Sequence, residues 1–208
     1  MATRALRLQA EDGVELEAEL DAVAPTARVA VVLCQPHPQY GGTMRSLVTS
    51  VLFNELPAAG SPCLRFNFRG VEGSTGEHSH GEREPLDVAA ALTEMATALP
   101  DTPIALVGWS FGADIALGVA DPRVAGWVAI APPLRVLPSF AAAADARPKH
   151  LILAEHDEVR APADVQRDVA SWIATTTAVV PGASHFFVGR TDAVVNETRA
   201  GLARVTAC

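Results

Sequence analysis

Gly108-Trp109-Ser110-Phe111-Gly112 is the stretch that decides the fold of this chain. An apolar run typical of a buried strand, 103–107, precedes it, and a run with helical spacing, 113–120, follows it. The pattern G-x-S-x-G between a strand and a helix predicts a nucleophile elbow, a tight turn that exposes a serine hydroxyl. Glycines are needed two residues to either side because larger side chains there would collide with neighbouring elements. A glycine-rich turn with an idle serine is the competing interpretation.

Strand-like and helix-like runs alternate on both sides of this turn. Residues 4–23 alternate around Glu11-Asp12-Gly13 and predict an antiparallel hairpin at a sheet edge. The other expected strands are 29–34, 62–68, 103–107, 124–131, 149–154 and 174–180. The expected helices are 44–56 with Thr43 as its cap, 84–98, 110–120, 162–173 and 190–206. Residues 35–42 are expected to be a non-helical loop, and 134–147 to hold at most a helical turn or two.

This order predicts one α/β domain over residues 1–208, with a mostly parallel, doubly wound sheet and helices on both of its faces. At 208 residues and 49% hydrophobic residues, the chain is large enough for one well-filled core. Because the segment 134–147 is short, we expect no sizeable lid over the end of the sheet.

Charge and cysteine content narrow the classes of partner and compartment. The net charge is −8 without a basic tract, so we expect neither a nucleic-acid nor a membrane partner. No run approaches the roughly 18 apolar residues of a membrane span, and the first residues turn polar too early for a signal peptide. The odd, sparse set Cys34, Cys63 and Cys208 is typical of a reducing compartment, with the first two as core residues. The sequence therefore predicts a cytoplasmic protein, and its oligomeric state stays open.

A base and an acid for Ser110 are found after later strands. Asp157 directly follows the expected strand 149–154, and His185 directly follows 174–180. Because parallel strands end at one edge of a sheet, these side chains are expected to meet there. His185 would take the serine proton and return it to the leaving group, while Asp157 would orient the imidazole.

Neighbouring residues offer alternatives to this assignment. Glu155 or Glu158 could replace Asp157 as the acid, and His156 could be mistaken for the base. Another pair, His78 and His80, is the only metal-like spacing, but no third ligand follows at the spacing of a zinc site. We therefore expect no metal and no cofactor.

Two backbone N–H groups are expected to stabilise an oxyanion. One is that of Phe111, directly after the serine, and the other should come from the loop 35–42. Proline has no N–H, so the candidate donors in this loop are His37, Gln39, Tyr40 and Gly41. We favour His37. Tyr40 and Trp109 are candidates for lining the substrate pocket, although Trp109 fits core packing as well.

Three segments together resemble a known family. Gln35–Met44, Phe66–Val71 and Gly108–Gly112 resemble a group of small α/β-hydrolases without a lid, related to dienelactone hydrolases. The resemblance spans 29–187 and implies the α/β-hydrolase fold, with a triad at Ser110, Asp157 and His185. It also implies an oxyanion hole from Phe111 and the His37 loop, and an esterase-like activity. The chain departs from the group's pattern at three positions, Gln35 for histidine and Glu72 and Arg83 for glycine.

The sequence thus predicts a serine hydrolase that cleaves a small carboxylic ester or thioester through an acyl-enzyme. Without a lid, we expect activity on short acyl chains in solution and no interfacial activation. An acyltransferase or peptidase would use the same triad, because the nucleophile does not specify the acyl acceptor. A catalytically silent fold that acts as a binding protein is the alternative from another class.

Overall fold

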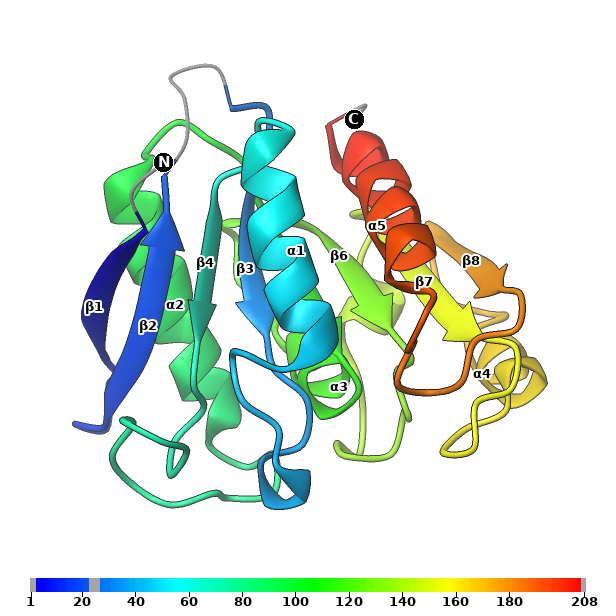
Figure 1. Ribbon diagram of the computed structural model, residues 1–208, viewed down its shortest axis with the longest axis horizontal. Helices are drawn as coiled ribbons and strands as arrows, with labels where there is room; N and C mark the ends of the chain where they lie inside the picture. Colours follow the sequence, from blue (N-terminus) through cyan, green and yellow to red (C-terminus); the bar gives the residue numbers. More distant parts are fainter. Residues whose placement is uncertain (1–2, 23–26, 207–208) are drawn as a thin grey trace.

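A single eight-stranded sheet forms the centre of the molecule (Figure 1), in the order β1-β2-β4-β3-β5-β6-β7-β8. The computed structural model describes residues 3–22 and 27–206. The strands are β1 (Arg4–Gln9), β2 (Glu15–Asp21), β3 (Ala30–Cys34), β4 (Cys63–Phe66), β5 (Ile104–Trp109), β6 (Val124–Ile130), β7 (Lys149–Ala154) and β8 (Thr175–Val180). β1 pairs antiparallel with β2, and β2 with β4, whereas every other pair is parallel.

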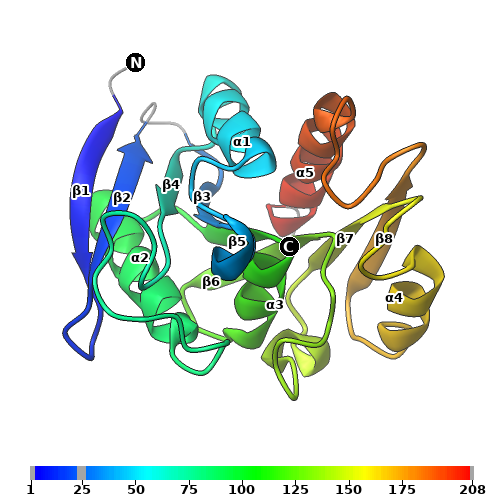
Figure 2. The ribbon, with the colours of Figure 1, turned by 60° about the horizontal axis from the view of Figure 1, so that its bottom comes forward.

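Helices cover both faces of this sheet, as Figure 2 shows. They are α1 (Leu47–Ala58), α2 (Glu84–Ala98), α3 (Phe111–Gly118), α4 (Pro162–Asp168) and α5 (Thr191–Val205), with short 3₁₀ helices η1 (Pro38–Tyr40) and η2 (Ala141–Ala144). α1 and α5 lie on one face, and α2, α3 and α4 on the other. Each face has its own apolar core, because a parallel sheet must be covered on both sides.

The burial of each strand follows its position in the sheet. All residues of β3 and β5 are buried, which explains why their sequences are continuously apolar. β1 and β8 form the two edges and are half-exposed, with β1 showing the alternation expected of a hairpin strand. β5 lies between β3 and β6, so the elbow that follows it is near the middle of the sheet.

The predicted fold class is confirmed: a mostly parallel sheet wound on both faces, with an N-terminal antiparallel hairpin and no sizeable lid. Only η2 forms in 134–147. Three details were wrong. Thr43 does not cap α1, which begins after Ser46, and α4 ends five residues earlier than expected, at Asp168 rather than 173. The loop 35–42, expected to be non-helical, contains η1, because Pro38 suits the first position of a helical turn.

Two further expectations concern composition. Cys34 and Cys63 are buried free thiols, while Cys208 lies outside the described residues. In the part of the chain that the structure describes, no helix has both the length and the apolar character that crossing a membrane requires.

Candidate active site

Ser110 occupies a strained turn between β5 and α3. Its φ of 55° and ψ of −119° are an unusual conformation for a residue with a side chain. A Cβ atom at Gly108 would lie 2.3 Å from the carbonyl oxygen of Gly112, and one at Gly112 would lie 2.3 Å from that of Gln35. The two glycines therefore permit this tight turn, as the sequence predicted. The N–H of Ser110 donates to the carbonyl of Ile130 over 2.8 Å, which fixes the elbow to β6.

His185 and Asp157 meet Ser110 at the carboxyl end of the sheet. His185, in the loop after β8, places Nε2 2.9 Å from the Ser110 hydroxyl oxygen. Its Nδ1 lies 2.9 Å and 3.0 Å from the two carboxylate oxygens of Asp157, in the loop after β7. A carboxylate can only accept, so Nδ1 carries the proton and Nε2 is left to accept the hydroxyl proton. Both Asp157 and His185 side chains are buried, which shields these hydrogen bonds from water.

Backbone contacts hold this trio in position. Asp157 Oδ1 accepts the N–H groups of Val159 and Arg160 over 2.8 Å and 3.0 Å, so the carboxylate also closes its own turn. The N–H of His185 donates to Glu158, and the Trp109 indole N–H donates to the carbonyl of His185. The histidine is thus tied from two sides at its backbone.

The alternative residues have other contacts. Glu155 accepts the N–H of Gly182, and Glu158 accepts the backbone of His185 rather than its ring. His156 is 70% exposed at its side chain and lies against Glu155. Of the acids and histidines considered from the sequence, the structure therefore brings only Asp157 and His185 into hydrogen-bonding line with Ser110.

Of the four candidates for the second oxyanion donor in the loop after β3, three already donate their N–H groups within the loop. The N–H of Gln39 donates to His37 Nδ1, that of Tyr40 to the His37 carbonyl, and that of Gly41 to the Pro38 carbonyl. Within the described residues, the His37 N–H has no such partner. On the other side, Phe111 is the first residue of α3, where the helix provides no acceptor for its N–H.

The side chain of Gln35 fixes the loop 35–42 in position, although sequence reasoning gave this residue no role. Its buried amide donates to the Gly42 carbonyl over 2.7 Å and accepts the Phe68 N–H over 3.1 Å. The loop is thereby tied to the end of β4. A Cβ atom at Gly42 would lie 2.3 Å from the Pro36 carbonyl oxygen, so this glycine allows the loop to fold back on itself.

The ring of His37 is part of an aromatic cluster beside the elbow. Its centroid lies 4.9 Å from that of Phe111 and 5.2 Å from that of His78. Burial, and secondarily the imidazoles of His78 and His80, lowers the pKa of His37, so the ring is neutral at neutral pH. The rings of His78 and His80 meet edge to face, with their centroids 4.6 Å apart. Residues 3–22 and 27–206 contain no group of three side chains placed to bind a metal ion.

A cavity of about 720 Å³ opens directly over Ser110. Its lining includes His37 and Phe111, whose N–H groups are the oxyanion candidates, and also Tyr40 and Trp109, as the sequence suggested. The remaining lining residues are Pro36, Gly41, Gly42, Ser46, Leu47, Pro133, Arg135, Val136, Val159, His185 and Phe186. Trp109 is also buried, so it packs in the core as well as lining the cavity.

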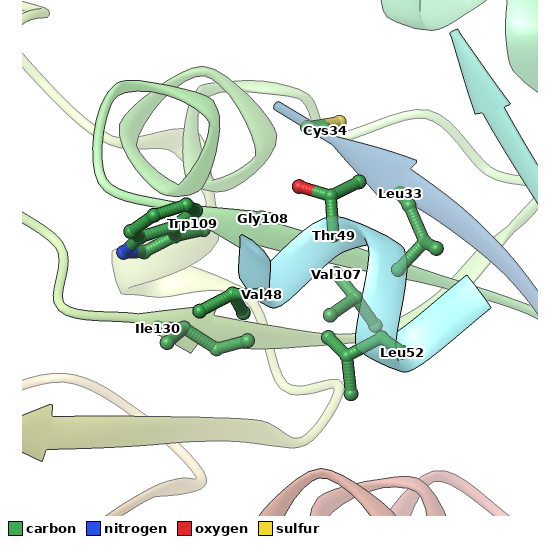
Figure 3. A pocket seen from close by; sticks show the side chains of 9 residues that line it. All are labelled: Leu33, Cys34, Val48, Thr49, Leu52, Val107, Gly108, Trp109 and Ile130. Atoms are coloured by element: carbon green, nitrogen blue, oxygen red, sulfur yellow. The ribbon is translucent and has the colours of Figure 1, made fainter. Parts of the chain in front are cut away.

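The opposite side of the elbow is close-packed. Figure 3 shows α1 placing Val48, Thr49 and Leu52 against β3, β5 and β6 directly behind Gly108. The gap between these side chains leaves no room for a water molecule. The elbow therefore has a dry, rigid support on one side and the open cavity on the other.

Asp114, one turn into α3, anchors the wall of the cavity. This fully buried carboxylate accepts the N–H groups of Leu134, Arg135 and Val136 over 2.9, 2.9 and 3.0 Å. Burial outweighs these hydrogen bonds and raises the pKa of Asp114 to about 6. Sequence reasoning missed this residue. The available signal was an acid in an otherwise apolar helix, four positions after Ser110.

Comparison with known proteins places the chain in a family. Residues 31–153 match the sequence profile of the alpha/beta hydrolase family. The chain belongs to the α/β hydrolase family. An uncharacterised protein of Rickettsia prowazekii is 33% identical to this hydrolase-family chain over 184 residues, which cover 82% of the chain and 76% of the relative.

Solved structures support the lidless subgroup. A serine hydrolase without a lid from Xanthomonas campestris superposes with a TM-score of 0.87 at 27% identity, covering 98% of this chain and 95% of that one. An α/β serine hydrolase homologue from Coxiella burnetii gives a TM-score of 0.83 at 32% identity, with 96% and 98% covered. A putative α/β hydrolase from Agrobacterium tumefaciens gives 0.85 at 31%, with 97% and 95% covered. The resemblance to small lidless α/β-hydrolases is therefore confirmed.

The structure explains one of the three positions at which the sequence differs from the pattern of the lidless group. Glu72, at a position where the group has glycine, adopts a φ of 46°. Its carboxylate accepts a hydrogen bond from Arg45 over 3.0 Å and one from Asn67 over 2.8 Å. These contacts hold a conformation that a residue with a side chain otherwise adopts at a cost.

Proposed function

We propose that this α/β hydrolase is a serine esterase that cleaves a carboxylic ester or thioester through a covalent acyl-enzyme. The observation that carries the proposal is the hydrogen-bonded line from Ser110 through His185 to Asp157 beneath an open cavity. Serine becomes a nucleophile when an adjacent base can take its proton and a third group orients that base. The kinship with serine hydrolases of the same lidless form supports the same chemistry.

In the first half of the reaction, Ser110 Oγ attacks the carbonyl carbon of the ester while its proton passes to His185 Nε2. The carbonyl oxygen becomes an oxyanion, and the N–H groups of Phe111 and His37 would donate to it. The tetrahedral intermediate then collapses, the bond to the leaving group breaks, and His185 returns the proton to the departing alcohol or thiol. Asp157 stabilises the imidazolium in between without taking the proton itself.

Water completes the cycle in the second half. His185 removes a proton from a water molecule, whose oxygen attacks the acyl carbon on Ser110. A second oxyanion forms in the same place, and its collapse breaks the bond between the acyl carbon and Ser110 Oγ, releasing the carboxylic acid, while His185 returns the proton to Oγ and restores the serine hydroxyl. The chain's own residues perform every one of these proton transfers, so the proposal invokes neither a cofactor nor a metal ion.

A fluorophosphonate probe, which modifies only activated serines, tests this proposal. We expect the native protein to be labelled at Ser110 and to hydrolyse p-nitrophenyl esters. The variant Ser110→Ala should lose both while its unfolding midpoint in urea stays close to that of the wild type. A native protein that resists the probe would favour the catalytically silent binding protein. Product analysis with competing alcohols and amines distinguishes hydrolysis from acyl transfer.

A further inference from the structure

Exposed apolar side chains gather at the mouth of the cavity. The described residues include six large hydrophobic side chains that are exposed: Tyr40, Leu47, Ile173, Val179, Phe186 and Val188. Three of these, Tyr40, Leu47 and Phe186, also line the cavity over Ser110. We call these three residues the apolar rim. Val188 is two residues beyond Phe186 and extends the same exposed loop.

The fold assembles the apolar rim from three separate segments. Tyr40 ends η1 and is 87% exposed, and Leu47 begins α1 and is 43% exposed. Phe186 follows His185 and is 53% exposed, with its ring 5.5 Å from the imidazole. Single exposed apolar residues need no explanation, but a group that converges on a cavity marks a binding surface.

The interior of the cavity has the same character as its mouth. Pro36, Trp109, Pro133, Val136 and Val159 contribute apolar surface, and no carboxylate lines the wall. Arg135 is the one lining residue with a permanent charge. A volume of about 720 Å³ falls within the range of roughly 300–1,000 Å³ typical of pockets for drug-sized ligands. An acetyl group would leave most of this space to water.

We propose that the substrate is an ester or thioester with an extended apolar chain or ring, which fills this cavity and ends on the apolar rim. The proposal rests on the function inferred above, because it places the ester carbon at Ser110. It departs from the preference for short acyl chains that the sequence suggested. Because no lid covers the apolar rim, the bound substrate itself shields these side chains from solvent.

The energy of apolar burial sets the size of the expected effect. Each fully buried methylene contributes enough to change kcat/KM about fourfold when the contact is kept in the transition state. We therefore expect kcat/KM to rise along a series of acetyl, butyryl, hexanoyl and octanoyl p-nitrophenyl esters, measured below their micelle concentrations. Variants are compared by their ratio of octanoyl to acetyl kcat/KM. A general loss of catalysis lowers both values by the same factor and therefore leaves this ratio unchanged.

The variants Leu47→Ser and Tyr40→Ser, alone and together, test the rim. We expect the double variant to lower the octanoyl-to-acetyl ratio of kcat/KM about tenfold, because apolar contact area at the mouth is lost. Ile173→Ser and Val179→Ser are the matched controls, since these residues are similarly exposed but do not line the cavity. They should leave the ratio unchanged. Phe186 is not substituted, because its ring packs against His185.

A binding measurement separates this proposal from the proposed function. Octanoic and butyric acid are titrated into Ser110→Ala by calorimetry, and we expect the longer acid to bind more tightly and the rim variants to remove that preference. If wild-type protein resists the fluorophosphonate probe yet this preference appears, the esterase proposal fails and the apolar site stands. An ester series that falls from acetyl to octanoyl, or rim variants that keep the wild-type ratio, would overturn the inference about the substrate.

Discussion

At the scale of single residues, the site depends on backbone groups as much as on side chains. Ser110 is presented by a conformation that two glycines make possible, and the donors that we propose for the oxyanion are main-chain N–H groups. Such groups cannot be removed by ordinary substitution, since every residue except proline has an N–H. Position 37 can therefore be used to test the role of a backbone N–H, because proline is compatible with the backbone conformation there and lacks the N–H.

Replacing His37 by proline should remove the second oxyanion donor and little else of the backbone. The φ of −59° at His37 is within the range that proline adopts. His37→Ala is the matched control, because it deletes the ring and keeps the N–H. We expect His37→Pro to have a kcat about 10²–10³-fold below that of His37→Ala, the usual effect of losing one oxyanion donor. Equal kcat values for the two variants would show that the His37 N–H does not serve the oxyanion.

At the scale of elements, α3 connects Ser110 to the wall of the cavity. Ser110 precedes this helix, and Asp114 within it holds the backbone of 134–136, the segment that contributes Arg135 and Val136 to the cavity lining. The carboxylate is fully buried, where its charge is costly. The shape of the cavity is therefore coupled to one buried acid, and the stability of the fold depends on its ionisation.

The pH dependence of stability should reveal this acid. Its pKa of about 6 in the folded protein exceeds the ordinary value of 3.8, so the folded state holds the proton more tightly. The stabilisation is complete below the ordinary value and is lost as pH rises through about 6. Compared with Asp114→Asn, the wild type should lose about 2 kcal/mol of unfolding free energy between about pH 4 and pH 7.

Urea unfolding of both proteins across that range measures the difference. Asp114→Asn also loses hydrogen bonds, which changes its unfolding free energy by an amount that does not vary with pH. The comparison therefore uses only how steeply the unfolding free energy of each protein changes with pH. Parallel pH profiles for wild type and variant would contradict the raised pKa of Asp114. Activity is not the readout, because it depends on the Ser110 site as well as on Asp114.

The sequence predicted those elements whose signals are local. α2 begins and ends where expected, at Glu84 and Ala98, because its apolar spacing and an early proline are both present in the chain. The cap of α1 was wrong because residues 43–46 form a turn of their own, in which Thr43 accepts the N–H of Arg45, and the N–H of Met44 donates to the distant Asn67. The serine, acid and histidine could be named because each follows its own strand.

The parts of the site that escaped prediction depend on contacts between distant segments. Gln35 and Asp114 act through backbone groups of loops that have no periodicity. The apolar rim joins Phe186 to Tyr40 and Leu47, which lie more than 130 residues earlier in the sequence, and nothing local marks the three as exposed together. Exposure of an apolar side chain is a property of the assembled surface, so it becomes visible only in three dimensions.

At the scale of the whole molecule, the site joins strands from the middle and the edge of the sheet. Ser110 follows β5 at the centre, whereas Asp157 and His185 follow β7 and β8 at one end. β8 pairs with β7 alone, and most of its side chains are only half-buried. α4, which covers this end, buries one of its seven residues, Val165. Elements with few buried apolar contacts open at lower free energy than the core of a domain.

We therefore expect the β8 end to open before the rest of the sheet, and activity to be lost with it. Fluorophosphonate labelling, which needs His185, should disappear at a lower urea concentration than the far-UV circular dichroism of the whole protein. Hydrogen exchange localises the event, because amides of 175–180 should exchange at urea concentrations that leave 104–109 protected. The amides of β5 are the internal control, since β5 is buried along its whole length between two partner strands. Labelling, dichroism and both sets of amides changing together would instead show that edge and centre unfold as one unit, and the base would then be held as firmly as the nucleophile.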